Sequence, residues 1–233
     1  MPSLDGATEW LNSEPLGPAG LRGHVVLVNF WTLTCINWLR QEPYVRAWSQ
    51  AYRDDGLIAI GVHTPEFSFE HDVDLVRQAT EERAIDYPVV VVPVQGVGVE
   101  AEADWDHLRT PETYLGSSRR ERSRQWVLTG EWTTTDEHVV LDRAGGTIAM
   151  RFHARDAHLV LSPGARDPIP FRLLLDGEAP GPSHGVDVDE DGNGVLSDGR
   201  MYQLVREHDK VRDRTLEITF LEPGAEAYAF TFG

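Results

Sequence analysis

The stretch Val25-Val26-Leu27-Val28-Asn29-Phe30-Trp31-Thr32-Leu33-Thr34-Cys35-Ile36-Asn37-Trp38 carries the strongest structural signal in the chain. Its apolar, β-branched half predicts a buried strand, and the amphipathic segment that follows predicts a helix. Cys35, which is the only cysteine of the protein, falls at the start of that helix. Backbone N–H groups and the helix dipole stabilise a thiolate in such a place, so we expect the pKa of this thiol to be lowered.

Strand-like and helix-like segments alternate over residues 20–93, which predicts right-handed crossovers and a parallel sheet. The expected strands are 25–31, 57–62 and 88–92, and the expected helices are 35–53 and 70–84. Pro43 lies inside the first helix and should kink it. One face of this helix is expected to carry Tyr44, Val45, Trp48 and Tyr52.

The pattern changes in the second half of the chain. Residues 94–110 show no strong period and are expected to form a linker. From Trp126 onward, apolar and polar residues alternate in short segments, which predicts an antiparallel β-sandwich. The alternation is clear in Ile148-Met150-Phe152, Leu173-Leu175, Leu216-Ile218-Phe220 and Tyr228-Phe230-Phe232.

Composition excludes several classes of partner. The 233 residues carry a formal net charge of −17, which argues against nucleic acid and anionic membrane surfaces. No apolar run approaches the ~20 residues that span a bilayer. The N-terminal residues 1–6 lack a basic region followed by an apolar one, so the sequence taken alone predicts a cytoplasmic protein. No Walker or dinucleotide fingerprint appears, and we expect no cofactor.

Several motifs of the first half point to a known family. They are Leu21-Arg22-Gly23, Phe30-Trp31-Thr32-Leu33-Thr34-Cys35-Ile36-Asn37, Leu39-Arg40, Pro43-Tyr44 and Gly61-Val62-His63-Thr64-Pro65-Glu66-Phe67. With them, residues 1–93 resemble the thioredoxin-like redoxin domain of DipZ-type cytochrome c biogenesis (disulfide-transfer) proteins. The resemblance implies an extracytoplasmic setting and thiol–disulfide exchange with a protein partner.

The second half carries three further motifs: Thr110-Pro111-Glu112-Thr113-Tyr114-Leu115-Gly116, Tyr202-Gln203-Leu204-Val205-Arg206 and Tyr228-Ala229-Phe230-Thr231-Phe232-Gly233. With them, residues 111–233 resemble the carbohydrate-binding-like sandwich that follows the redoxin domain in the same proteins. The expected architecture is therefore a truncated thioredoxin-like α/β domain followed by an all-β, jelly-roll-like sandwich. The family implies a carbohydrate or peptide ligand for the sandwich.

The chain departs from the family pattern in three places. Trp38 stands where the family has the resolving cysteine of its Cys-x-x-Cys motif, and the family's membrane-spanning portion is absent. The family's cis-proline hairpin and last helix also have no counterpart after residues 88–92. Without that hairpin, the strand 25–31 should become a sheet edge. We expect Trp10-Leu11, the linker, the sandwich or a second copy of the chain to cover it, the last by a homodimer.

Cys35 leads to two main hypotheses. In the first, the protein is a degenerate redoxin that binds rather than catalyses, and Cys35 is an inert relic beneath Trp31 or Trp38. In the second, Cys35 is the catalytic residue of a monothiol thiol–disulfide oxidoreductase, whose mixed disulfide is released by an external thiol. Peroxide reduction through a sulfenic acid is a third, weaker alternative.

Binding and metal sites are less clearly marked. Trp31 and Trp132 are the substrate-binding candidates, with Trp126, Tyr114 and Tyr202 as further aromatic candidates in the sandwich. A calcium-loop pattern runs through Asp187, Asp189, Asp191, Asn193 and Asp198. Since no amphipathic helix flanks it, we expect an acidic hairpin tip instead and no metal site.

Overall fold

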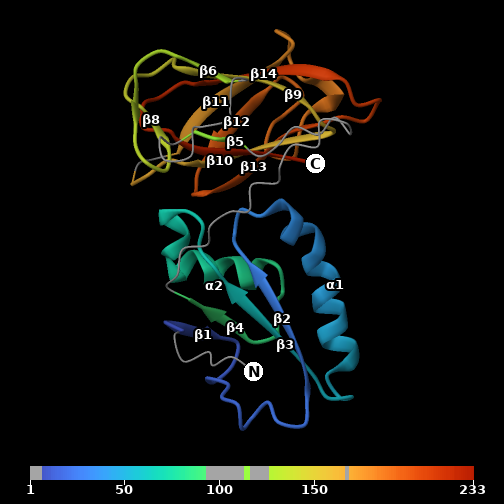
Figure 1. Ribbon diagram of the computed structural model, residues 1–233. Coiled ribbons are helices and arrows are strands. Elements are labelled where there is room, and N and C mark those ends of the chain that lie inside the picture. The colour runs from blue at the N-terminus through green and yellow to red at the C-terminus, as the bar shows by residue number, and fades with distance from the viewer. Residues whose placement is uncertain (1–6, 93–112, 116–125, 166–167) are drawn as a thin grey trace. The chain divides into compact units, whose positions relative to one another are not determined.

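The computed structural model describes residues 7–92, 113–115, 126–165 and 168–233. The chain divides into two compact units, Met1–Gly98 and Val99–Gly233 (Figure 1). The expected linker, residues 94–110, lies outside the described residues.

The first unit is built on a sheet in the order β1-β4-β3-β2. Its strands are β1 (Glu9–Leu11), β2 (Val25–Trp31), β3 (Leu57–His63) and β4 (Val89–Val91). β2, β3 and β4 run parallel, as the alternating pattern predicts, whereas β1 joins β4 in the antiparallel sense. The α/β class expected for this half is confirmed.

Two α-helices connect these strands. α1 (Ile36–Tyr52) begins directly after Cys35 and contains Pro43, and α2 (Val73–Glu82) follows the 3-10 turn η1 (Ser68–His71). The second helix therefore begins three residues later than expected. Asp72 explains this start, because its carboxylate accepts a hydrogen bond of 2.9 Å from the Asp74 N–H and caps α2.

The buried face of α1 differs from the expected one. The side chains of Trp38, Glu42, Val45 and Ser49, which recur every three or four residues, are buried. Tyr44, Trp48 and Tyr52 are 64%, 46% and 52% exposed. The expectation that these aromatic residues share the buried face with Val45 is wrong: they recur every four residues along a stripe beside it.

Each face of this sheet has its own apolar cluster. α1 and α2 cover one face, where Val45 and Val76 pack with Trp31, Ala59 and Val89. On the other face, Ile60, Val62 and Val90 of the sheet pack with Leu21 from the segment before β2.

β2 forms one edge of the sheet and pairs with β3 alone among the described residues. The N-terminal strand was one candidate to cover this edge, but it pairs with β4 at the opposite side of the sheet, so that expectation is wrong. Val25 and Phe30 are each 69% exposed on the edge strand.

The second unit is a β-sandwich of two antiparallel sheets, as expected. One sheet has the order β13-β10-β15-β8-β7, with β5 also paired to β15, and the other has the order β12-β11-β14-β9-β6. The strands of the first sheet are β5 (Thr113–Tyr114), β7 (Trp132–Thr134), β8 (Val139–Leu141), β10 (Asp156–Ser162), β13 (Arg200–Arg206) and β15 (Glu226–Phe232). Those of the second are β6 (Trp126–Thr129), β9 (Thr147–His153), β11 (Ile169–Leu175), β12 (Asn193–Leu196) and β14 (Asp213–Phe220).

One apolar core joins the two sheets of the sandwich. Ile148 and Met150 of β9 and Ile218 of β14 pack against Leu159 of β10 and Phe230 of β15. These inward-facing residues are the ones that the alternating sequence pattern marks as buried.

Candidate functional site

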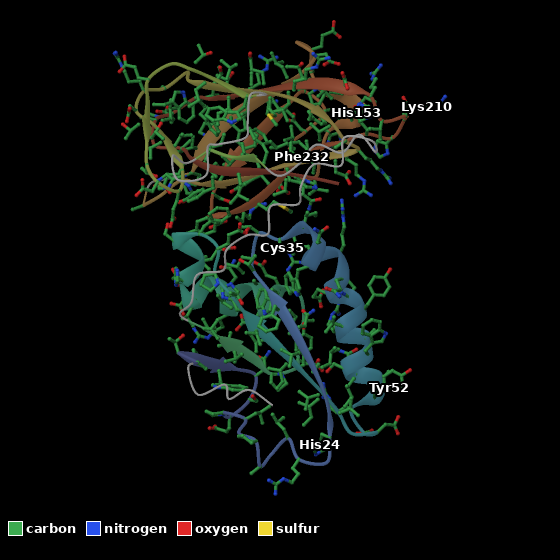
Figure 2. The ribbon with its side chains drawn as sticks, viewed as in Figure 1. His24, Cys35, Tyr52, His153, Lys210 and Phe232 are labelled. Carbon is green, nitrogen blue, oxygen red and sulfur yellow. The ribbon has the colours of Figure 1, made fainter. Side chains whose placement is uncertain are left out.

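Cys35 lies at the junction of β2 and α1, at the end of the first unit opposite His24 (Figure 2). It is the N-cap of α1, and its Sγ accepts a hydrogen bond of 3.5 Å from the Trp38 backbone N–H. The side chain is half-buried. A sulfur that accepts a backbone N–H at a helix N-terminus is stabilised more as a thiolate than as a thiol.

Trp38, for which the sequence resemblance predicts a lost resolving cysteine, carries a fixed aromatic ring. Only 3% of the residue is exposed. Its ring stacks on Trp31 with a centroid separation of 4.3 Å, and its Nε1–H donates a bond of 2.9 Å to Asn29 Oδ1. The guanidinium of Arg83 lies 5.7 Å from the ring centroid. Since the chain holds no second cysteine, a Cys35 mixed disulfide has no internal thiol to resolve it.

Trp31, predicted as a substrate-binding residue, lies inside the first unit. It is 4% exposed and packs between the ring of Trp38 and the edge-on imidazole of His63, whose centroid is 4.8 Å away. The reason is the strand alternation, which turns Trp31 toward the helix-covered face of the sheet.

Glu70 is a buried residue of the site that the sequence analysis missed. Its Oε1 accepts bonds from the N–H and the hydroxyl of Thr34, at 3.1 and 3.0 Å. Its Oε2 accepts bonds from the N–H groups of Glu66 and Phe67, at 2.6 and 3.0 Å. Burial raises the pKa of Glu70, and the hydrogen bonds that it accepts act in the opposite direction. No periodic pattern marks this residue, because its partners on the Cys35 loop are 36 positions away.

His63 is a second buried titratable group near this end of the sheet. It is fully buried at the end of β3, beside Trp31. Burial, with a smaller contribution from the charge of His71, lowers the pKa of His63 to about 4. Its imidazole is therefore neutral at physiological pH.

The aromatic candidates of the sandwich belong largely to its core. Trp132 is half-buried, packs edge-on against Phe220 and donates its Nε1–H to Thr129 O at 3.0 Å. Tyr202 is fully buried, and Trp126 also packs against the core. The side chain of Tyr114 lies outside the described residues. Trp132, predicted as a substrate-binding residue, thus packs its ring against the apolar core.

Asp187 and Asp189 of the predicted calcium loop use their carboxylates in hydrogen bonds within the protein. Asp187 binds the Arg200 guanidinium and the Gln203 N–H, each at 2.7 Å. Asp189 accepts a bond of 2.7 Å from the Asn193 N–H at the start of β12. Across the described ranges, no group of three or more His, Cys, Asp or Glu side chains is placed to hold a metal ion. The described residues also include no helix long and apolar enough to cross a membrane.

Comparison with known proteins gives one family match and several sequence relatives. Residues 120–233 match the family described as "Thioredoxin like C-terminal domain". Over 93 residues, the chain is 45% identical to Protein DipZ of Mycobacterium tuberculosis, which is 39% of this chain but only 13% of DipZ. It is 28% identical over 91 residues to Thiol-disulfide oxidoreductase YkuV of Bacillus subtilis, which is 39% of this chain and 61% of that protein.

A solved structure gives a similar match. It is the solution structure of a thioredoxin-like protein in the oxidised form, with 28% identity and a TM-score of 0.37 over 40% of this chain and 63% of the other. The sequence matches, together with the fold and the placement of Cys35, lead to one conclusion. The chain is similar to thioredoxin-like proteins and to Protein DipZ over the matched residues.

Proposed function

We propose that the first unit carries out thiol–disulfide exchange with a single cysteine, Cys35. The observation that supports this most directly is the hydrogen bond from the Trp38 backbone N–H to Cys35 Sγ, at the N-terminus of α1. An inert relic would be expected to lie deep in the core, whereas the Cys35 side chain is only half-buried.

The reaction follows from the residues present. The Cys35 thiolate attacks one sulfur of a partner disulfide, forms a mixed disulfide with it and releases the other sulfur as a thiolate. An external thiol then attacks the mixed disulfide, takes the partner sulfur into a new disulfide and regenerates the Cys35 thiolate. Trp38 has no sulfur with which to perform this second step, so an external thiol is required for turnover.

The names of the relatives support the same chemistry. YkuV is described as a thiol-disulfide oxidoreductase. For this chain we propose a protein disulfide as the partner and, by the relationship to DipZ, an extracytoplasmic setting. The carbohydrate or peptide ligand expected for the sandwich stays a prediction.

A second copy of the chain is also proposed as a partner, at the β2 edge. Val26, Val28 and Phe30 turn their N–H and C=O groups away from β3, because the alternate residues Val25 and Trp31 bond toward it. Two such edges can pair in the antiparallel sense about a two-fold axis.

The test of the exchange function is the alkylation rate of Cys35 as a function of pH. Labelling reports on this site alone, because the chain has no other cysteine. We expect an apparent thiol pKa below the ordinary ~8.5, and a faster reaction at pH 7 than in the urea-unfolded chain. The folded protein should also form a mixed disulfide with a model disulfide, and Cys35→Ser should form none. Labelling that is slower in the folded than in the unfolded chain would reject exchange and favour the degenerate redoxin.

A further inference from the structure

Glu70 joins two loops that meet near Cys35. Backbone N–H groups of Thr34, Glu66 and Phe67, which have no capacity to accept, donate to it together with the Thr34 hydroxyl. Thr34 directly precedes Cys35 in the chain. The carboxylate therefore connects the β2–α1 loop to the loop between β3 and η1, and Glu70 and Thr34 are both nearly inaccessible to solvent.

We propose that Glu70 is a positioning residue for Cys35, whose carboxyl group holds the β2–α1 loop so that the thiol stays on the N-terminus of α1. This inference rests on the proposed exchange function for its consequence, and on the hydrogen bonds of Glu70 for its geometry. Nothing in it requires Glu70 to touch a substrate.

The carboxyl group of Glu70 satisfies the donors of both loops at once, because each of its oxygens can accept. A carboxylate accepts on both oxygens, whereas a glutamine accepts on one oxygen and presents an NH₂ group at the other position. In Glu70→Gln, that NH₂ must face either the Thr34 N–H or the N–H groups of Glu66 and Phe67. Each arrangement sets donors against a donor, so one of the two loops is released.

Losing a negative charge at Glu70 and losing the position that Glu70 fixes would shift the pKa of the Cys35 thiol in opposite directions. The two effects can therefore be told apart. A nearby negative charge disfavours the thiolate, so its removal alone would lower the thiol pKa. Loss of the N-cap geometry removes a stabilisation of the thiolate and would raise the thiol pKa. The sign of the shift in Glu70→Gln therefore tests positioning directly.

Other titratable groups surround this site. Glu66 and His71 flank the Glu70 loop, Arg83 of α2 lies over Trp38, and His63 of β3 is buried beside Trp31. All of them are kept unchanged in the variants compared, so a shift of the Cys35 profile is assigned to the substituted residue.

The matched control is Glu42→Gln. Glu42 is also a buried carboxylate of the first unit, 2% exposed on α1, and its Oε1 accepts a bond of 2.9 Å from Arg46 Nε. Glu42→Gln therefore changes a buried carboxylate of the same unit, with the loss of stability that this brings, but it leaves the hydrogen bonds of the Cys35 loop intact.

The experiment measures the pH dependence of Cys35 alkylation in the full-length wild type, Glu70→Gln and Glu42→Gln. We expect the thiol pKa to rise by about half a unit in Glu70→Gln and to stay unchanged in Glu42→Gln. Glu70→Asp retains the charge but is too short to reach both loops, so it should also raise the thiol pKa and serves if Glu70→Gln does not fold. A lowered or unchanged thiol pKa in the Glu70 variants would overturn the proposal.

A second measurement keeps this proposal separate from the exchange function. Amide hydrogen exchange at Trp38, whose N–H donates to Cys35 Sγ, reports the position of the thiol whether or not it reacts. We expect exchange at this amide to be at least ~10-fold faster in the Glu70 variants and unchanged in Glu42→Gln. If wild-type Cys35 is unreactive, only the proposed thiol–disulfide exchange is rejected. If amide hydrogen exchange at Trp38 is equally fast in all variants, only the Glu70 proposal is rejected.

Discussion

Replacing Trp38 by cysteine should give the first unit a dithiol at a measurable cost in stability. Trp38 is 3% exposed, stacks on Trp31 and bonds to Asn29 Oδ1. Truncation of a buried tryptophan costs roughly 3–5 kcal/mol of unfolding free energy, part of it from the cavity that is left. Closing the four-residue loop between positions 35 and 38 as a disulfide returns about 2 kcal/mol. The oxidised Trp38→Cys variant should therefore be roughly 1–3 kcal/mol less stable than the wild type.

Two assays test this prediction. The first is urea unfolding of Trp38→Cys with and without reductant, and the second is the catalysed reduction of insulin disulfides. Trp38→Ser is the control, since it loses the same packing but adds no thiol. We expect reduction to lower the unfolding free energy of Trp38→Cys to that of Trp38→Ser, and only the cysteine variant to gain turnover. If the two thiols of Trp38→Cys do not form a disulfide under air, the assignment of position 38 as the lost resolving site is refuted.

Two further predictions follow from the buried histidine and from the exposed strand edge. The pKa of His63 is lowered to about 4, so between pH 6.5 and 4 the unfolded chain binds more protons than the folded one and stability falls as the pH falls. The unfolding free energy should fall by at most about 3 kcal/mol over this range. Urea unfolding at several pH values should show that this free energy depends less on pH in His63→Leu than in the wild type. At the β2 edge, we expect sedimentation to show a concentration-dependent dimer that Phe30→Lys dissociates and Tyr52→Lys, on the exposed face of α1, does not. A wild type that remains monomeric up to ~100 μM would contradict pairing through this edge.

Local sequence patterns were sufficient to predict the main elements. The apolar run before Cys35 and the amphipathic segment after it specify a strand and a helix without help from the rest of the chain. In the sandwich, alternation in segments such as 148–152 specifies which side chains are buried. The α/β unit, the sandwich and the position of Cys35 at a helix start are all features of this local kind.

The predictions that failed depend on contacts between distant segments. The buried face of α1 is set by the sheet beneath it, and aromatic residues such as Tyr44 and Trp48 did not identify that face. The pairing of β1 with β4 rather than β2 is a matter of topology, which the three residues of β1 do not encode locally. Glu70 is linked to Thr34 across 36 positions, and no periodicity records such a link.

Trp38 has two separate effects on the chemistry of this site. Its side chain carries no sulfur, so it cannot resolve a mixed disulfide of Cys35. Its backbone N–H donates to Cys35 Sγ, and a backbone donor does not depend on which side chain the residue carries. The hydrogen bond to Cys35 Sγ therefore does not require a cysteine at position 38. A thiol that reacts but cannot resolve holds its partner until another thiol arrives, so the same substitution that ends dithiol turnover would favour capture of a disulfide partner over its release.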